Sequence, residues 1–383
     1  LEALLEASYA YVDQSQYSTA IEVHAKHTAL CDALGLAEDA FERIKALPER
    51  ADLARHQGNM AESKAFGERA WRATEHATGR EALMIHAHAS RGLGVVNWLA
   101  GNLDAAEEHV ETALALYEKL GEGVGRLRTL HTKAWLMLRK NQQKEAVEAF
   151  EEGDRIGERM GEKTHRAWCI HGLAEVSVRA GKTGRGVKLG RQARILFEES
   201  GAMAGVAFSQ VCIGDALRLG GNPVSAEPHY AGAHDVLSAL GSVLTHVNTF
   251  KRGMNFAMLR DWEGVERQLI QLEAQPNLVP RTRDDTEMLR GCLASHEGDA
   301  ERFTTVLGRA LEGLLNETDA HPDQVVLLRL AHENWLKHGR PDLAAVCASS
   351  IKRVTDQLRQ PELDFTAPIE TGVSIWSKPT PEG

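Results

Sequence analysis

The same short turn recurs along the chain at a spacing close to 40 residues. Four successive copies begin at Gly101, Asn141, Gly181 and Gly221, and a helical pattern with a small residue near its start follows each. Weaker copies lie on both sides, so that turns are predicted near residues 15, 58, 101, 141, 181, 221, 260, 298 and 339. A repeat of this length predicts an array of about nine helical hairpins, in which each hairpin buries its core against its neighbours.

A small residue recurs seven positions before the turn in most of these units. It is found at Ala51, Gly94, Ala134, Ala174, Gly214, Gly253 and Gly291. A residue with little or no side chain lets the two helices of a hairpin approach closely. The abundance of Ala, Leu, Glu and Arg, with only 5% aromatic residues, also favours helices over sheets.

These features resemble the tetratricopeptide repeat family. Leu93 and Gly94 are similar to the family's Leu-Gly pair, and Gly101, Asn102 and Ala106 are similar to its turn and the alanine that follows. The units here are longer than the usual length of about 34 residues. In this they are similar to the extended repeats of kinesin light chain and of the sensor arrays of bacterial signal-transducing ATPases. The family's final proline is missing, and its large aromatic residue in the first helix is inconsistent.

The resemblance covers about residues 1–357. It implies an all-α fold, a right-handed superhelical solenoid of about nine hairpins that we place over residues 1–360. Residues 361–383 lose the period and contain four prolines, so an irregular tail is expected there. Trp376 in this tail could dock on the array or reach a partner, although a loose end is the simpler interpretation.

Charge and cysteine usage narrow the classes of function. The net charge of −10 argues against direct binding of nucleic acid, which requires a basic surface. Five widely spaced cysteines without a CxxC pair are typical of a reduced cytoplasmic protein, and no apolar run is long enough to span a membrane. The chain begins at Leu1 inside a helical pattern, so we expect a piece of a longer protein whose effector domain is missing.

Two fragments resemble catalytic or metal-binding motifs. Residues 180–183 (AGKT) are similar to the end of a phosphate-binding loop, but Val176 stands where that loop needs glycine, and the fragment falls on a predicted repeat turn. His24, His27 and Cys31 could share one face of a helix, yet zinc would need a fourth ligand. We expect ordinary packing at both places, and therefore no catalytic residues, cofactor or metal.

The resemblance also implies that the first helix of each hairpin lines a concave groove. Residues six and three before the small residue, and one and four after it, should face that groove. The predicted contacts are His88, Arg91, Trp98, Arg128, His131, Trp135, Trp168, His171, Asp215, Arg218 and Phe250. Trp and Arg are frequent at energetic hot spots, and Arg binds carboxylates with two parallel hydrogen bonds. These residues favour a peptide with acidic and apolar side chains, although the tryptophans could instead pack between hairpins.

The sequence therefore favours a protein-interaction module. It would be a scaffold, or the sensory or regulatory part of a larger bacterial-type signalling protein, whose partner is a protein or peptide. A receptor for a small molecule or a short signalling peptide is the alternative, and an enzyme is the least favoured class. Self-association through the ends of the array is a further prediction, while the acidic runs on second helices are interpreted as solvated faces.

Overall fold

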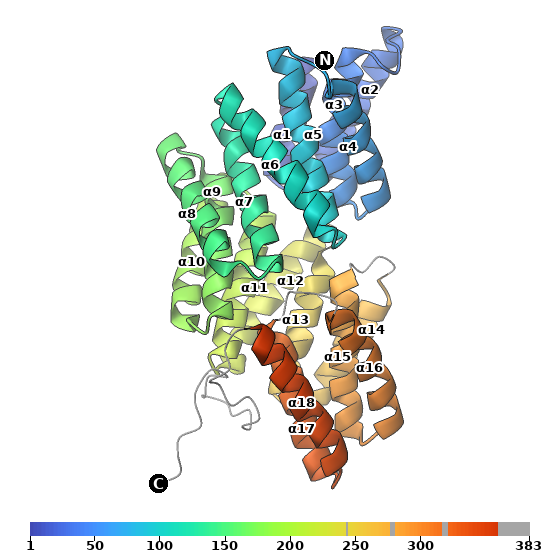
Figure 1. Ribbon diagram of the computed structural model, residues 1–383, viewed down its shortest axis with the longest axis vertical. Helices are drawn as coiled ribbons and strands as arrows, with labels where there is room; N and C mark the ends of the chain where they lie inside the picture. Colours follow the sequence, from blue (N-terminus) through green and yellow to red (C-terminus); the bar gives the residue numbers. More distant parts are fainter. Residues whose placement is uncertain (243, 276–279, 316–320, 359–383) are drawn as a thin grey trace. The chain divides into compact units, whose positions relative to one another are not determined.

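In the computed structural model, helices occupy nearly all of the described chain, which comprises residues 1–242, 244–275, 280–315 and 321–358. Eighteen helices follow one another, and no strand occurs in this part of the chain (Figure 1). The predicted all-α fold of helical hairpins is confirmed. The tail predicted over residues 361–383, with Trp376, lies outside the described residues.

Each hairpin consists of a first and a second helix. The first helices are α1 (Glu2–Asp13), α3 (Phe41–His56), α5 (Arg80–Leu99), α7 (Gly123–Arg139), α9 (Lys163–Arg179), α11 (Met203–Leu219), α13 (Thr245–Met258), α15 (Pro280–Glu297) and α17 (Pro322–Lys337). The second helices are α2 (Tyr17–Ala33), α4 (Met60–Thr74), α6 (Leu103–Leu120), α8 (Gln143–Met160), α10 (Thr183–Ser200), α12 (Pro223–Ala239), α14 (Trp262–Glu273), α16 (Ala300–Leu315) and α18 (Pro341–Gln357).

The turn inside each hairpin contains a residue with positive φ at each of the nine positions predicted from the repeat. Six of these residues are glycines, which adopt this conformation without steric cost, and the others are Ser15, Asn141 and Arg260. The side chains of Asn59 and Asp261 then cap the next helix, since each accepts a hydrogen bond from the backbone N–H three residues later.

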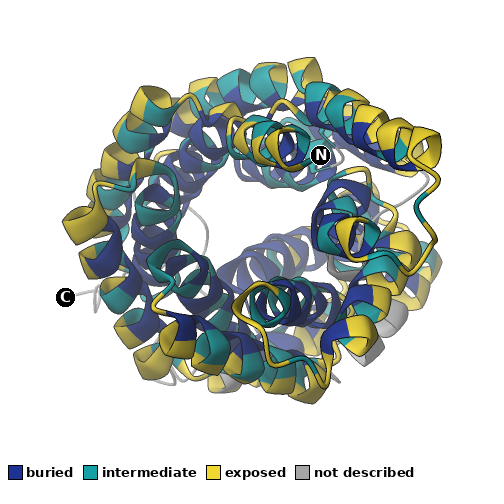
Figure 2. Ribbon diagram, turned by 90° about the horizontal axis from the view of Figure 1, so that it is seen from above, coloured by how far each residue is buried: buried dark blue, intermediate teal, exposed yellow. Residues whose placement is uncertain are grey.

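Helix α8 shows why these segments are helical and which side they bury. Its buried residues include Ala146, Phe150, Gly153 and Ile156, and their spacing of three and four places them on one face. Gly161 ends the helix in the left-handed conformation, with φ of 68°. Figure 2 shows the same division elsewhere: helices carry buried residues along one side and exposed residues along the other.

The small residue in the first helix marks a close approach between the helices of a hairpin. A Cβ atom added at Gly94 of α5 would lie 2.8 Å from Cγ2 of Val110 on α6, which is closer than real contacts. Gly92, two residues earlier on α5, has nothing within 4 Å of the same added atom in the described chain. The packing of α5 on α6 therefore requires glycine at position 94 but not at position 92.

This difference predicts opposite effects of the same substitution at the two positions. Gly92→Ala should raise the free energy of unfolding by up to about 1 kcal/mol, because alanine favours helix more than glycine does. Gly94→Ala should be less stable than Gly92→Ala by about 1–3 kcal/mol, because Val110 must shift. Urea midpoints of the two variants and the parent protein measure the effect, and equal midpoints for both variants would contradict the close approach.

Contacts divide the chain into two compact units, whereas the sequence predicted one array over residues 1–360. The first unit comprises Leu1–Leu173, Gln192–Val206 and Val236–Val243, and the second comprises Ala174–Arg191, Ala207–Asp235 and Leu244–Gly383. Tyr117 and Phe150 are fully buried in the first unit. In the second unit Trp335 is fully buried, with its ring centre 5.1 Å from that of Phe303.

Of the helices in the described ranges, none combines the length and the apolar character that a membrane span requires.

Candidate functional site

The first helices of the first unit meet along a shared face, which we call the first-helix face. Tyr9 of α1 lies beside His88 of α5, with ring centres 6.1 Å apart. Arg91 of α5 donates a hydrogen bond to Asp52 of α3, with an N–O distance of 2.7 Å. Residues predicted from the repeat to face one groove, His88 and Arg91 among them, therefore meet residues from neighbouring hairpins.

An aromatic strip runs along this face over helices α5, α7 and α9. The ring centres of Trp98 and Trp135 lie 6.4 Å apart, and Nε1 of Trp135 donates a hydrogen bond of 2.9 Å to Nε2 of His131. His131 lies 5.8 Å from Trp168, which lies 5.7 Å from His171. The structure thus brings together five of the side chains predicted as groove contacts.

The tryptophans of the strip serve packing as well as forming a surface. Trp135 contacts Phe150 of α8 edge-on at 5.8 Å, and Trp168 contacts Phe197 of α10 at 4.7 Å. Yet Trp98, Trp135 and Trp168 remain half-buried, so part of each ring is still accessible. Packing between hairpins and a role in binding are therefore both compatible with these positions.

The arginines of the face are already paired with carboxylates of the same unit. Arg91 contacts Asp52, and Arg128 of α7 contacts Asp13 at the end of α1 with an N–O distance of 2.5 Å. Burial alone would raise the pKa of Asp52, but the guanidinium groups of Arg91 and Arg55 outweigh it and hold that pKa below its usual value. The Asp13 side chain is 40% exposed, so its pair with Arg128 is the more accessible of the two.

The histidines of the face are neutral at neutral pH, which limits the positive charge that the sequence suggested. Burial lowers the pKa of His88 and His131 to about 3, and that of His171 to about 4. Their rings therefore act as aromatic and hydrogen-bonding groups. Only Arg91 and Arg128, among the predicted contacts of this unit, carry positive charge.

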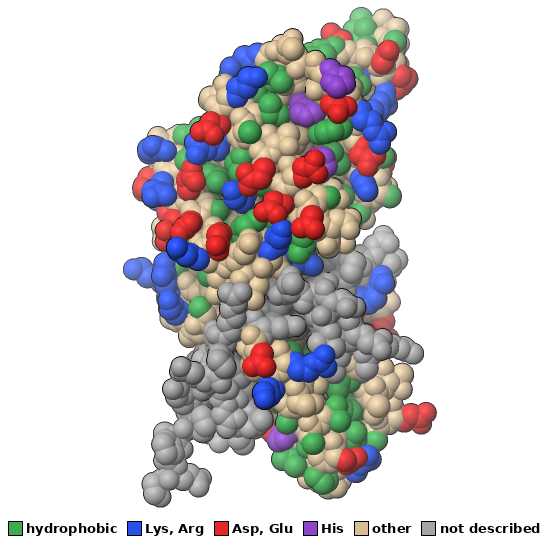
Figure 3. Space-filling model, in the orientation of Figure 1, with side chains coloured by type: hydrophobic (Ala, Val, Ile, Leu, Met, Phe, Trp, Pro, Cys, Tyr) green, Lys and Arg blue, Asp and Glu red, His purple; other side chains and the backbone are tan. Residues whose placement is uncertain are grey.

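The outer surface of the first unit carries charges of both signs. Figure 3 shows Asp and Glu side chains interspersed with Lys and Arg. Lys140 lies 2.5 Å from Glu107, and Lys133 lies 2.7 Å from Glu111. Mixed and exposed pairs of this kind contribute little to stability and keep a surface hydrated.

Three predicted contacts, Asp215, Arg218 and Phe250, lie in the interior of the second unit. Their exposed fractions are 2%, 0% and 3%. Nη2 of Arg218 donates to Asp215 at 2.8 Å and to Asp323 at 2.6 Å, and Lys251 lies 2.5 Å from Asp323. Two cations and two carboxylates thus compensate one another in a buried ion cluster. These side chains do not form a surface that a partner reaches in this structure.

The ion cluster predicts a large loss of stability when one of its carboxylates is removed. Asp323→Ala should lower the free energy of unfolding by about 3–5 kcal/mol, because Arg218 and Lys251 would stay buried with too little negative charge. Asp342→Ala is the matched control, since its pair with Arg340 is exposed and should contribute little to stability. Chemical denaturation of both variants distinguishes the cases, and similar midpoints would contradict the cluster's role.

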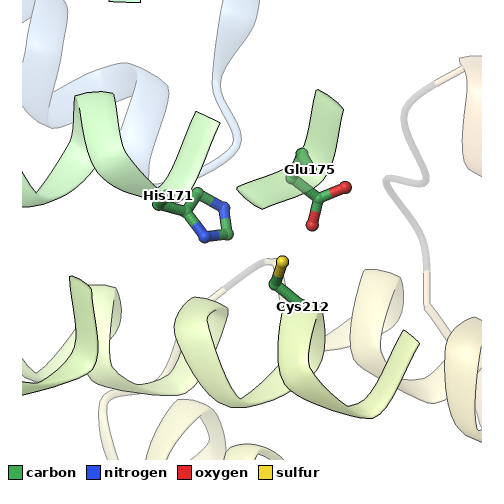
Figure 4. A group of neighbouring side chains, drawn as sticks. All are labelled: His171, Glu175 and Cys212. Atoms are coloured by element: carbon green, nitrogen blue, oxygen red, sulfur yellow. The ribbon is translucent and has the colours of Figure 1, made fainter. Parts of the chain in front are cut away.

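A carboxyl–thiol pair lies close to the ion cluster within the second unit. Glu175 of α9 points toward Cys212 of α11, and His171 precedes Glu175 by one turn of α9 (Figure 4). Burial raises the pKa of both Glu175 and Cys212 and so favours the protonated form of each. The pair offers two ligand atoms within its unit, fewer than a zinc site takes from protein, and we assign no metal to it.

Glu49 of α3 is a buried carboxyl that the sequence analysis did not identify. Its exposed fraction is 1%, and neither carboxyl oxygen has a hydrogen-bond partner of good geometry in the described chain. Nε2 of His24 lies 4.0 Å away. Burial is the main cause that raises the pKa of Glu49; Ser8 and Arg128 oppose the rise and the charges of Asp52 and Asp13 add to it, and together they place the pKa at about 8.

This shift predicts that the contribution of Glu49 to stability falls as pH rises. The Glu49 carboxyl titrates near 4.5 when unfolded and near 8 when folded, so between these values only the folded state holds the proton. The contribution of Glu49 to the free energy of unfolding should therefore decrease from pH 5 to pH 8, whereas the buried histidines, whose pKa values are lowered from 6.5, contribute the opposite trend in the lower part of this range. Glu49→Gln removes this contribution and should stabilise the protein more at pH 8 than at pH 5, by urea midpoint. The exposed Glu145→Gln is the control, and a gain from Glu49→Gln that is equal at both pH values would contradict the assignment.

Comparison with known protein families gives a match to two hairpins of the first unit. Residues 85–153, from α5 to α8, match the family model described as tetratricopeptide repeat. These hairpins are tetratricopeptide repeats. The resemblance inferred from the Leu-Gly pair and the turn is confirmed. No curated protein matches the chain.

Several solved structures share the fold at low sequence identity. A Rap protein complexed with competence and sporulation factor has a TM-score of 0.68 and 11% identity, and the match covers 94% of this chain and 98% of that one. Aspartyl phosphate phosphatase F from Bacillus subtilis has a TM-score of 0.56 and 10% identity, and the match covers 82% of this chain and 93% of that one. NprR in complex with its cognate peptide NprX has a TM-score of 0.53 and 12% identity, and the match covers 84% of this chain and 89% of that one. At these identities the likeness concerns the fold alone.

Proposed function

We propose that the chain is the recognition part of a regulatory or signalling protein, and that it binds a short peptide or an extended protein segment on the first-helix face of its first unit. It acts by binding, not by catalysis. The observation that carries the proposal is the aromatic strip of Trp98, His131, Trp135, Trp168 and His171, whose rings contact one another across three hairpins.

The strip is suited to apolar and aromatic side chains of a ligand. Four of its rings are half-buried and held by their neighbours, so a ligand would meet a preformed surface. The fifth ring, that of His171 at the end of the strip, is buried. Nε1 of Trp98 is buried and has no hydrogen-bond partner among the described residues. A carbonyl oxygen of a bound peptide could accept from it, which would satisfy a group that is costly to leave unpaired.

A carboxylate of the ligand would find its partner in Arg128. That guanidinium now contacts Asp13, whose side chain is accessible enough to be displaced. Arginine binds carboxylates with strong, oriented hydrogen bonds. Because the neighbouring histidines are neutral, recognition of one carboxylate, rather than attraction of a strongly acidic peptide, fits this face better.

The comparisons support this proposal through fold. Two structures with similar folds are complexes with a factor or a cognate peptide, namely the Rap protein with competence and sporulation factor and NprR with NprX. This chain covers most of the length of both. A short peptide is accordingly favoured over a folded partner.

Selection of binders from a random library of short peptides tests the proposal. The Kd of a selected peptide should rise at least about tenfold in Trp98→Ala, which corresponds to a loss of about 1.4 kcal/mol. Trp71→Ala is the matched control, because Trp71 lies in the same unit but packs on His86 and His109 away from the strip. Thermal melts establish that both variants fold. Failure to select any peptide whose affinity depends on Trp98 would overturn the proposal.

A second experiment tests the role of Asp13 as an internal competitor. Asp13→Asn should increase the affinity for a peptide that carries a carboxylate by several-fold, because Arg128 no longer has to exchange one carboxylate for another. The amide version of the same peptide should show no gain. Asp104→Asn is the control, since Asp104 is fully exposed and pairs with Lys140 on the outer surface. An equal gain for the acid and the amide would contradict displacement of Asp13.

A further inference from the structure

The first unit also contains a cavity, which lies away from the first-helix face. It is a pocket of about 170 Å³ between α2, the following loop, α3 and α4. Its lining is mostly polar and includes three arginines, namely Arg43, Arg50 and Arg69, together with His27 and Cys31. The peptide-binding proposal does not use any of these side chains.

The two carboxylates that line the pocket form ion pairs with two of its three arginines. Arg43 contacts Asp32 with an N–O distance of 2.6 Å, and Arg69 contacts Glu38 at 3.1 Å. Arg50 has no acidic partner in the described part of the chain. Its guanidinium carbon instead lies 4.2 Å from the ring centre of Phe66, so the aromatic face holds the cation in place. The pocket therefore has one positive charge more than its own carboxylates compensate.

His27 adds a hydrogen-bond donor to this charge. It is 2% exposed, and burial, together with nearby positive charges that include Arg43 and Arg50, lowers its pKa. The ring is therefore neutral at neutral pH, with a proton on one nitrogen only. Nδ1 lies 3.8 Å from Sγ of Cys31, and in the tautomer in which Nδ1 accepts from that thiol the proton is on Nε2. Nε2 has no hydrogen-bond partner among the described residues.

An uncompensated guanidinium and a buried, unpartnered N–H in one polar cavity form a site for a negatively charged oxygen group. We propose that this pocket binds a small oxyanion, the phosphate or carboxylate group of a small molecule, through Arg50 and Nε2 of His27. The size agrees, because a cavity of about 150 Å³ is large enough for a benzene ring. A phosphate ion with a bridging water, or a small carboxylic acid, fits in the observed volume.

Inorganic phosphate and acetate are the probes for this site. Isothermal titration at fixed ionic strength, with chloride as the balancing anion, should give saturable binding of at least one of them to the full chain. Arg50→Gln and His27→Gln should each weaken that binding at least about tenfold. Arg72→Gln should leave it unchanged, because Arg72 lies on α4 outside the pocket and pairs with Glu68. Preferential binding of phosphate or of acetate identifies the class of the natural ligand.

A further variant keeps the test decisive if Arg50→Gln does not fold. Arg50→Lys retains the charge over Phe66 and should retain measurable binding, weaker than that of the parent because lysine lacks the planar fork. Absence of saturable binding of both probes to the parent protein would overturn the proposal. So would binding that survives unchanged in both His27→Gln and Arg50→Gln. Neither result bears on peptide binding, whose tests use the first-helix face.

Discussion

The hairpins of α5 and α11 depend on the close approach of their two helices at one position of the first helix. In α5 this position is Gly94, against Val110, and in α11 it is Gly214, against Tyr230. The approach fixes the rotation of the first helix, and so it decides which side chains face the neighbouring hairpins. At Gly214 it also brings the Tyr230 hydroxyl to 3.0 Å from Nε of Arg218, so that a packing constraint contributes to the buried ion cluster.

Arginines predicted to face the groove have different surroundings in the two units. Arg218 is fully buried, and its charge is compensated by Asp215 and by Asp323, which lies 105 residues further along the chain. Arg128 is compensated by Asp13, from the end of α1, whose side chain remains partly exposed. To exchange one carboxylate for another costs little free energy at an accessible ion pair and much more at a buried one. This difference is why binding is proposed on the first unit and not at Arg218.

The repeat period was sufficient to predict the hairpins, their turns and the small residues, because these depend on short-range geometry. It also predicted that Trp98, Trp135 and Trp168 share a face, since the three repeat positions that they occupy all lie on the groove side of the first helix. It could not identify Asp13 or Asp323 as partners of the arginines, because such pairs join helices that are far apart in sequence. Nor could it show that the histidines are neutral or that Glu49 is buried, because a pKa depends on burial that no periodic pattern specifies.

Helix α3 connects the two sites proposed for the first unit. Asp52 belongs to the first-helix face, whereas Arg50, two residues earlier, lines the oxyanion pocket. Burial chiefly lowers the pKa of His24, and His27 and Arg50 lower it further; His24 lies 4.0 Å from the buried carboxyl of Glu49. An oxyanion at Arg50 would cancel part of that positive field and favour a protonated His24 beside an ionised Glu49. Glu49 lies near Asp13 and Arg128, so ligand charge in the pocket would alter the electrostatics of the first-helix face.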